Sequence, residues 1–143
     1  MELTDDEVEF LTRHHSAAMI TLRPDGTPHA VRVGVALVDG RLCSSGTQGR
    51  LRTGHLRRDP RAALFVFEPR WGALTLESRV TILDGPEAPE QSLRLFQVMQ
   101  GRDPNLETIT WYGKELSREQ FLEQMVSERR LIYEFEVLRT YGL

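Results

Sequence analysis

The chain has 143 residues and a formal net charge of −3, with 18 Lys and Arg against 21 Asp and Glu. That length fits a single domain over residues 1–143, and 40% hydrophobic residues are enough for an ordinary buried core. The slight negative charge argues against a protein that coats nucleic acid, and the single cysteine excludes an internal disulfide. No apolar run is long enough to cross a bilayer, and the acidic N-terminus does not resemble a signal peptide. We therefore expect a cytoplasmic protein whose partners include neither nucleic acid nor a membrane.

The first part of the chain predicts a helix followed by an antiparallel meander. Thr4 and Glu7 form a capping box that begins a helix over 5–13. Period-two alternation and apolar runs predict the next three strands, over residues 17–22, 29–38 and 41–45. A Pro-Asp-Gly turn and an Asp-Gly turn join these strands, and their glycines accept the positive φ that such turns need.

The rest of the chain continues this alternation. Gly46-Thr47-Gln48-Gly49 breaks the third strand, and the nearly continuous apolar run over 61–67 is typical of a strand buried on both faces. The remaining predicted elements are a helix over 50–58, a strand over 74–82, a helix over 89–100, a helix begun by a Ser117–Gln120 capping box, and a closing strand over 131–137. Six strands joined mostly by tight turns predict a mainly β fold with short helices, in the form of a small antiparallel barrel.

Few side chains carry recognisable chemistry. None of the four histidines is spaced from another as metal ligands on one element would be, so we expect no metal site. Cys43 lies inside a predicted strand without a flanking activator, which favours a buried, inert thiol over a nucleophile. The sequence contains no Gly-x-Ser-x-Gly elbow, no P-loop and no Gly-x-Gly-x-x-Gly fingerprint. Hydrolase, kinase and simple Rossmann functions therefore have little support.

The segment 43–61 concentrates arginines. Of the 18 basic residues 17 are Arg, an excess that codon bias in a high-GC genome explains in general, but five of them fall within residues 50–61. The hydroxyls of Ser44, Ser45 and Thr47, a glycine turn and a helix N-terminus accompany them, and together such groups form anion sites. A solvated helix with surface arginines is the competing interpretation. Nucleic-acid binding is disfavoured because no aromatic residues interleave with the arginines.

Two motifs flank a Val-rich strand: Pro-Asp-Gly-Thr-Pro-His over 24–29, and Leu-Arg-Arg-Asp-Pro-Arg-Ala-Ala-Leu over 56–64. With them the chain resembles the pyridoxamine 5′-phosphate oxidase-like superfamily of split β-barrels. Within it the chain is most similar to the short flavin/deazaflavin oxidoreductases of B type, many of which use coenzyme F420. The resemblance runs from Thr4 to about Tyr141 and is strongest over 49–61. It implies a six-stranded antiparallel split β-barrel of the FMN-binding kind, and a homodimer with cofactor sites at the interface.

The resemblance also implies which residues bind the cofactor. Hydroxyls after the third strand and the basic pair that begins the next helix would hold its phosphate, and Gln48 lies in the same turn. The residues concerned are Ser44, Ser45, Thr47, Gln48, Arg50 and Arg52. The turn before the second strand lies near the ring system in this family, which implies contacts from His29 and Val31. Many relatives have Lys where Arg52 stands and Asn where His55 stands.

The implied activity is that of an oxidoreductase. It would transfer a hydride between reduced F420 and a small conjugated organic acceptor of the enone, quinone or tetrapyrrole type. FMN is the alternative cofactor, because Arg50 and Arg52 suit its phosphate equally well. A non-catalytic cofactor- or haem-binding protein of the same fold is the alternative function.

Several aromatic and polar side chains are candidates for substrate contact or proton donation. Trp71 and Tyr112, with Trp111, could form walls for a flat substrate or ring, although such residues also occur in cores and dimer contacts. His29, Tyr112 and Arg79 are candidate proton donors, and bulk water is another source. The sequence does not single out a catalytic residue.

Overall fold

The computed structural model describes residues 1–106 and 108–143. Along the chain the elements are α1 (Asp5–Arg13), β1 (Ser16–Leu22), β2 (Pro28–Val38), β3 (Arg41–Thr47), α2 (Leu51–Arg58), β4 (Arg61–Phe67), β5 (Ala73–Leu83), α3 (Ala88–Met99), β6 (Thr108–Trp111), β7 (Lys114–Ser117), α4 (Arg118–Ser127) and β8 (Arg130–Tyr141). Both predicted capping boxes are present, one at Thr4 and one at Ser117. In the described residues no helix is long and apolar enough to span a membrane.

Six strands of the described chain close into a barrel in the order β1-β2-β3-β8-β5-β4, and every neighbouring pair is antiparallel. The prediction of a mainly β fold with a six-stranded antiparallel barrel is therefore confirmed. β8 comes last in the sequence but lies between β3 and β5. Its first residue, Arg130, pairs with Thr47 at the end of β3, so side chains far apart in the sequence meet at this corner.

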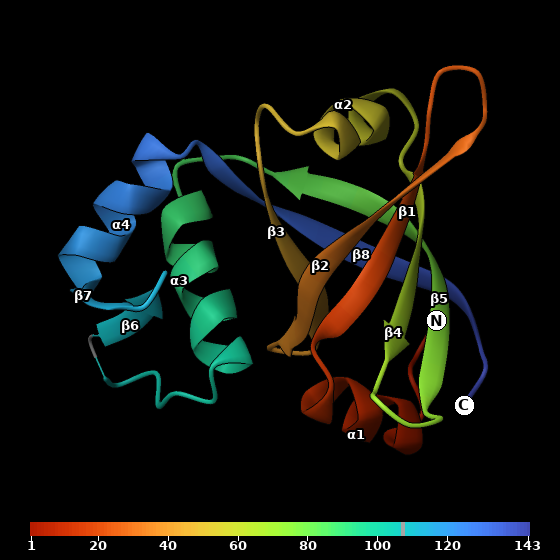
Figure 1. Ribbon diagram of the computed structural model, residues 1–143, viewed down its shortest axis with the longest axis horizontal. Helices are drawn as coiled ribbons and strands as arrows, with labels where there is room; N and C mark the ends of the chain where they lie inside the picture. The colour runs from red at the N-terminus through yellow and green to blue at the C-terminus, as the bar shows by residue number, and fades with distance from the viewer. Residues whose placement is uncertain (107) are drawn as a thin grey trace.

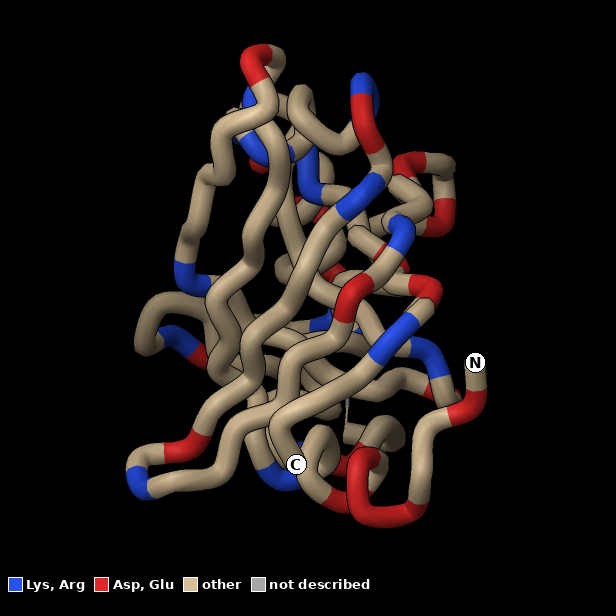
Figure 2. Tube along the Cα trace, turned by 90° about the vertical axis from the view of Figure 1, so that its right-hand side faces the viewer, with Lys and Arg blue, Asp and Glu red and all other residues tan. Residues whose placement is uncertain are grey.

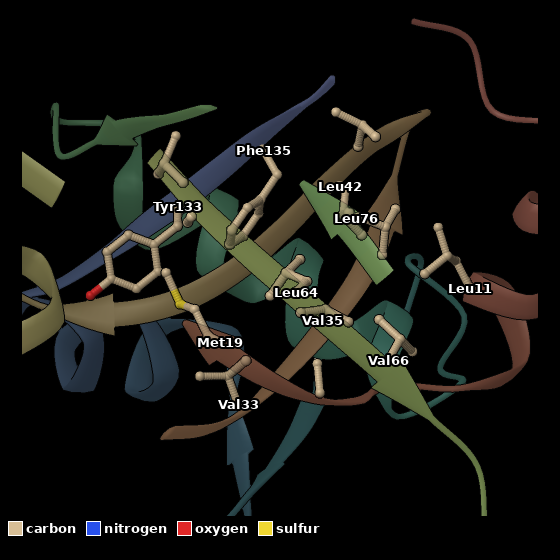
Figure 3. Packing of buried hydrophobic residues seen from close by; sticks show 14 of the residues in the cluster. Leu11, Met19, Val33, Val35, Leu42, Leu64, Val66, Leu76, Tyr133 and Phe135 are labelled. Atoms are coloured by element: carbon tan, nitrogen blue, oxygen red, sulfur yellow. The ribbon is translucent and has the colours of Figure 1, made fainter. Parts of the chain in front are cut away.

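Aliphatic side chains fill the interior of the barrel. Successive strand residues point to opposite faces of the sheet, and on β1, β4 and β5 the burial pattern alternates, with the inward set buried. Met19, Leu64 and Leu76 are fully buried in this cluster (Figure 3). Tyr133 lies at one end of the cluster, and its hydroxyl points away from the aliphatic side chains. The core therefore ends in a polar group at the side that α2 covers.

The helices cover some sides of the barrel and leave another open (Figure 1). α1 lies across one end of the barrel and α2 across the other, while α3 packs along the outside of β2, β3 and β8. α4 and the β6–β7 hairpin lie beyond α3 and share a second small core with it. This second core contains Leu93, Ile109, Phe121 and Met125. Apart from the barrel end that α2 covers, the side formed by β1, β4 and β5 carries no helix in the described chain.

β3 is longer than the sequence predicted. Gly46 and Thr47, expected to break the strand, instead continue the ladder because they pair with Leu131 and Arg130 of β8. Gly46 is required at this point, since a Cβ atom there would lie 2.2 Å from the hydroxyl of Tyr133. The glycine therefore allows a close approach of ring and backbone, and it does not end the strand.

The expectation that 61–67 is buried on both faces is wrong for the described chain. Only the inward set of β4 is buried, whereas Phe65 and Phe67 are 41% and 37% exposed and stack on each other with ring centroids 5.9 Å apart. On the neighbouring strand β1, Ala18 pairs with Phe65 and Ile20 pairs with Ala63, so these residues lie on the same outward face. Figure 2 shows this side of the molecule, where long stretches of strand carry no charged residue. We call the outward residues of β1 and β4 the open sheet face.

The β6–β7 hairpin lies where the sequence predicted no element. Its turn residues, Tyr112 and Gly113, have φ values of 48° and 79°, as both central residues of a type I′ turn require. Asn or Asp usually occupies the first of these positions, so the Tyr-Gly pair did not stand out as a hairpin signal. The hairpin is tied to α3 because the Gln100 side chain donates to the Thr110 carbonyl at 2.8 Å and accepts from the Thr110 N–H at 3.2 Å.

Candidate functional site

A cleft of about 470 Å³ lies outside the barrel, where the N-terminus of α2 faces the β6–β7 hairpin and the C-terminal end of α3. Four guanidinium groups line it, from Arg32, Arg50, Arg52 and Arg130. Among the described residues that line the cleft, none is Asp or Glu. This concentration of positive charge in a net-negative protein favours an anionic ligand.

Arg52 is the best-defined cationic group of the cleft. Its guanidinium lies 5.6 Å from the centre of the Tyr133 ring, and its Nη2 donates to the Ser45 carbonyl at 3.3 Å. Its Nε is buried and has no hydrogen-bond partner among residues 1–106 and 108–143. Burial, together with the charges of Arg50 and Arg130, lowers the pKa of the Arg52 guanidinium, while Tyr133 acts in the opposite direction. An anion in the cleft would offset the burial of this charge.

The start of α2 adds to this positive potential. Arg50 is the N-cap residue, and within the described chain no side chain caps the helix and no acidic residue occupies its first turn. Helix N-termini normally favour acidic side chains, because their free N–H groups carry partial positive charge. Two arginines at this position are therefore unfavourable in the free protein and suited to a bound phosphate.

A half-buried carboxylate, Glu128, orients two walls of the cleft. Glu128 accepts a hydrogen bond from Trp111 Nε1 at 3.0 Å and pairs with the Arg130 guanidinium at 2.8 Å. Burial alone would raise the pKa of Glu128. Hydrogen bonds from Gln124, Arg130 and Trp111 outweigh this effect and lower the pKa from 4.5. The Arg130 guanidinium also lies 5.1 Å from the centre of the Trp111 ring. Glu128 thus fixes the indole and neutralises Arg130, so the remaining guanidinium groups carry the charge of the cleft.

The junction between β3 and α2 is held by a buried hydroxyl pair. Thr53 Oγ1 lies 2.5 Å from the Tyr133 hydroxyl and also donates to the Thr47 carbonyl at 2.7 Å. The Tyr133 ring packs over Gly46 and under Arg52. These contacts set the direction in which α2 begins, and therefore the position of its first arginines.

The structure brings some of the predicted cofactor residues together and separates others. Ser45, Arg50 and Arg52 line the cleft, as does Tyr112. Ser44 does not line it, because this residue faces the interior and its hydroxyl donates to the Gly34 carbonyl at 2.7 Å.

Three further predicted contacts lie outside the lining. The Thr47 carbonyl accepts from Thr53, and Gln48 accepts a hydrogen bond from Arg57 at 2.8 Å. Val31 packs against the barrel core. None of these three residues is among those that line the cleft in the described chain.

The other candidates for substrate contact and proton donation lie elsewhere. Trp71 is 95% exposed in the β4–β5 loop, whose Gly72 lies against Phe10 of α1 at the opposite end of the barrel. Arg79 is exposed on β5, opposite Glu136 of β8. His29 packs edge-to-face on His55 with ring centroids 5.1 Å apart. Of the proposed proton donors only Tyr112 lines the cleft in the described chain.

Sequence reasoning missed Arg32 and Arg130 and gave no role to Glu128. Arg32 lies on the outward side of β2, among residues whose alternation was interpreted only as core packing. Arg130 reaches the cleft only because β8 pairs with β3. The expected burial of Cys43 is confirmed, and burial together with the nearby Glu134 raises the pKa of its thiol to about 12. In the part of the chain that the structure describes, no three His, Cys, Asp or Glu residues could hold a metal ion.

A family model described as pyridoxamine 5′-phosphate oxidase matches residues 3–133. The chain belongs to this family. As a pyridoxamine 5′-phosphate oxidase-like protein, it has the fold of a family that consists mostly of flavin- or F420-dependent oxidoreductases and also includes non-catalytic members. A search of curated proteins found no match.

Solved structures with this fold differ in what they bind. The conserved hypothetical protein Rv2991 from Mycobacterium tuberculosis is 20% identical with a TM-score of 0.75, over 96% of this chain and 82% of that one. An F420 reductase is 18% identical with a TM-score of 0.70, over 99% of this chain and 100% of that one. The haem storage protein HutZ from Vibrio cholerae is 10% identical with a TM-score of 0.66, over 99% of this chain and 95% of that one. At such identities the likeness to these three structures concerns the fold alone.

The cleft fits the phosphate of a flavin or deazaflavin. The unpartnered Nε of Arg52, the uncapped start of α2 and the lack of carboxylates among the described lining residues are all features that an anion would complement. Arg50 and Arg52 supply planar donors suited to phosphate oxygens. The residues present are therefore compatible with the cofactors that the family uses.

Proposed function

We propose that the protein is an F420-dependent oxidoreductase that reduces a small conjugated organic acceptor of the enone, quinone or tetrapyrrole type. The observation that supports it most is the arginine-lined cleft at the start of α2, with the unpartnered Nε of Arg52, in a chain of this family. A structural neighbour named as an F420 reductase shares this fold over 99% of the chain, which makes the deazaflavin the first cofactor to test.

The chain itself would contribute binding, orientation and shielding. Arg50 and Arg52 would hold the phosphate at the start of α2, and Trp111, fixed by Glu128, would form a rigid wall of the site. A bound deazaflavin supplies the hydride. The hydroxyl of Tyr112, at the rim of the cleft, or solvent would supply a proton.

Removal of one phosphate ligand tests the site. We expect Arg52→Ala to weaken cofactor binding by about 1–3 kcal/mol, as the loss of a hydrogen bond to a charged group does. Fluorescence titration of the purified variant with F420 measures this. Arg13→Ala, on an exposed turn of α1 at the other end of the barrel, should bind F420 like the wild type. Unchanged affinity in Arg52→Ala would refute the phosphate assignment.

A cofactor screen separates the alternatives. The purified protein is titrated with F420, FMN, FAD and haem, and reduced F420 is then offered with enone, quinone and tetrapyrrole acceptors. Preferential F420 binding with oxidation on addition of an acceptor is the expected result. Tight FMN binding would favour the FMN-dependent alternative, since Arg50 and Arg52 suit either phosphate. A Soret band on adding haem, without any response to F420, would favour a haem-binding protein like the neighbour HutZ.

We also propose that the protein works as a homodimer with cofactor sites at the interface. The open sheet face supports this, because it exposes stacked aromatic rings and carries no helix in the described chain. An apolar strand face of this kind is normally covered by another layer. A second copy of the chain is the partner that the family resemblance implies.

A further inference from the structure

We propose that the acceptor is a planar conjugated carboxylate, with its plane against Trp111 and Tyr112 and its carboxylate on Arg32. This inference rests on the proposed function, in which Arg50 and Arg52 hold the phosphate of the cofactor. It names the chemical class of the acceptor and the residue that selects it.

The cleft has one guanidinium more than a single phosphate needs. Arg130 is paired with Glu128 at 2.8 Å, and the two arginines at the start of α2 match the one to two negative charges of a phosphate group. Arg32 remains. It is exposed, forms no ion pair with any described residue, and has a single long contact, from Nη2 to Ser16 Oγ at 3.5 Å. Its fork of N–H groups is therefore free to bind an anion.

The hairpin adds an aromatic corner to the same cleft. The rings of Trp111 and Tyr112 lie 5.0 Å apart at an angle of 86°, and Trp111 is held from behind by Glu128 and Arg130. Tyr112 is 81% exposed, and its φ of 48° is uncommon for a residue with a side chain. The type I′ turn of the hairpin requires this φ. Here it holds a large aromatic ring at the mouth of the cleft.

These two features together select a ligand class. Two perpendicular aromatic rings suit a flat, conjugated group better than a flexible chain. The planar Arg32 guanidinium matches a carboxylate through two parallel hydrogen bonds. A glutamate side chain on the cofactor also carries a carboxylate, but it lacks the flat group that the aromatic corner accommodates.

Binding of a planar acid to the cofactor-free protein provides the test. Trp111 becomes the only indole in a Trp71→Phe background, because the chain has two tryptophans, so quenching of its fluorescence reports on the cleft. Titrations use trans-cinnamate and its uncharged analogue methyl cinnamate. We expect the acid to bind about tenfold more tightly than the ester, as one charged hydrogen bond provides. Arg32→Gln should abolish this preference, whereas Arg13→Gln should retain it.

Several outcomes would overturn the inference. Equal affinities for acid and ester would do so, as would a preference that survives in Arg32→Gln. Displacement of cinnamate by inorganic phosphate would mean that the carboxylate and the cofactor phosphate bind at one and the same anion site. Displacement by F420 but not by FMN would assign Arg32 to the glutamate tail of the cofactor. Failure of the proposed function is distinguishable, since the cofactor screen would then show no binding while the cinnamate preference remained.

Discussion

At the scale of single residues, His55 links the charge state of α2 to stability. This buried ring lies with Nδ1 2.9 Å from Thr21 Oγ1 and packs against His29 of β2. Burial, with the charges of His29, Arg58 and Arg23, lowers the pKa of His55 from 6.5. The folded protein therefore holds the imidazole in its neutral form more strongly than the unfolded chain does.

The sign of the pH dependence follows from this shift. Because the unfolded chain binds the proton more readily, the stabilisation is present above pH 6.5 and is lost as the pH falls from there through the lowered pKa of His55. We expect the Tm to fall between about pH 7 and pH 5, and to fall less in His55→Asn. Thermal unfolding followed by circular dichroism measures both slopes, with His14→Asn as the control. Equal slopes in the wild type and His55→Asn would contradict the assignment.

At the scale of elements, the β3–α2 junction depends on Gly46. A Cβ there would lie 2.2 Å from the Tyr133 hydroxyl, so the ring and its bond to Thr53 would have to move. We expect Gly46→Ala to lower the free energy of unfolding by about 1–3 kcal/mol, as overpacking of a filled core does. Urea denaturation measures this. Gly49→Ala, in the same segment but with nothing within 4 Å, should have an almost unchanged midpoint, and equal losses in the two variants would exclude the steric explanation.

Local signals in the sequence predicted most elements. Capping boxes and tight turns act over a few residues, so the helices at Thr4 and Ser117 and the meander could be identified directly. The β6–β7 hairpin was missed because its strands have four residues each and its turn begins with Tyr112. Its position depends on packing against α3 and α4, which no local pattern encodes.

The candidate site could be predicted only in part. Arg50 and Arg52 stood out because neighbouring residues make a helix start. Ser44 and Ser45 were grouped together, yet adjacent strand residues face opposite sides of the sheet. Ser44 therefore faces the barrel interior, whereas Ser45 lines the cleft. Arg130 joins the site through a strand pairing that spans most of the chain. Local sequence could not reveal that contact.

At the scale of the whole molecule, the open sheet face determines the proposed dimer. We expect Phe65→Glu to convert a dimer into a monomer, because a charge would be buried between two apolar faces, and to weaken F420 binding with it. Light scattering after gel filtration measures the mass. Val126→Glu, at an exposed site on α4 beyond α3, should remain dimeric. A wild-type protein that is monomeric, or a Phe65→Glu variant that stays dimeric, would refute this interface.

The position of β8 has a consequence for biosynthesis. This strand pairs with β3 on one side and β5 on the other, so two sheet edges stay open on the ribosome until residues 130–141 have emerged. Unpaired edges recruit other chains, and closure over such long sequence separations is slow. A nascent chain that stalls before Arg130 would therefore expose both edges at once, and chaperones would be needed most until β8 has paired with β3 and β5.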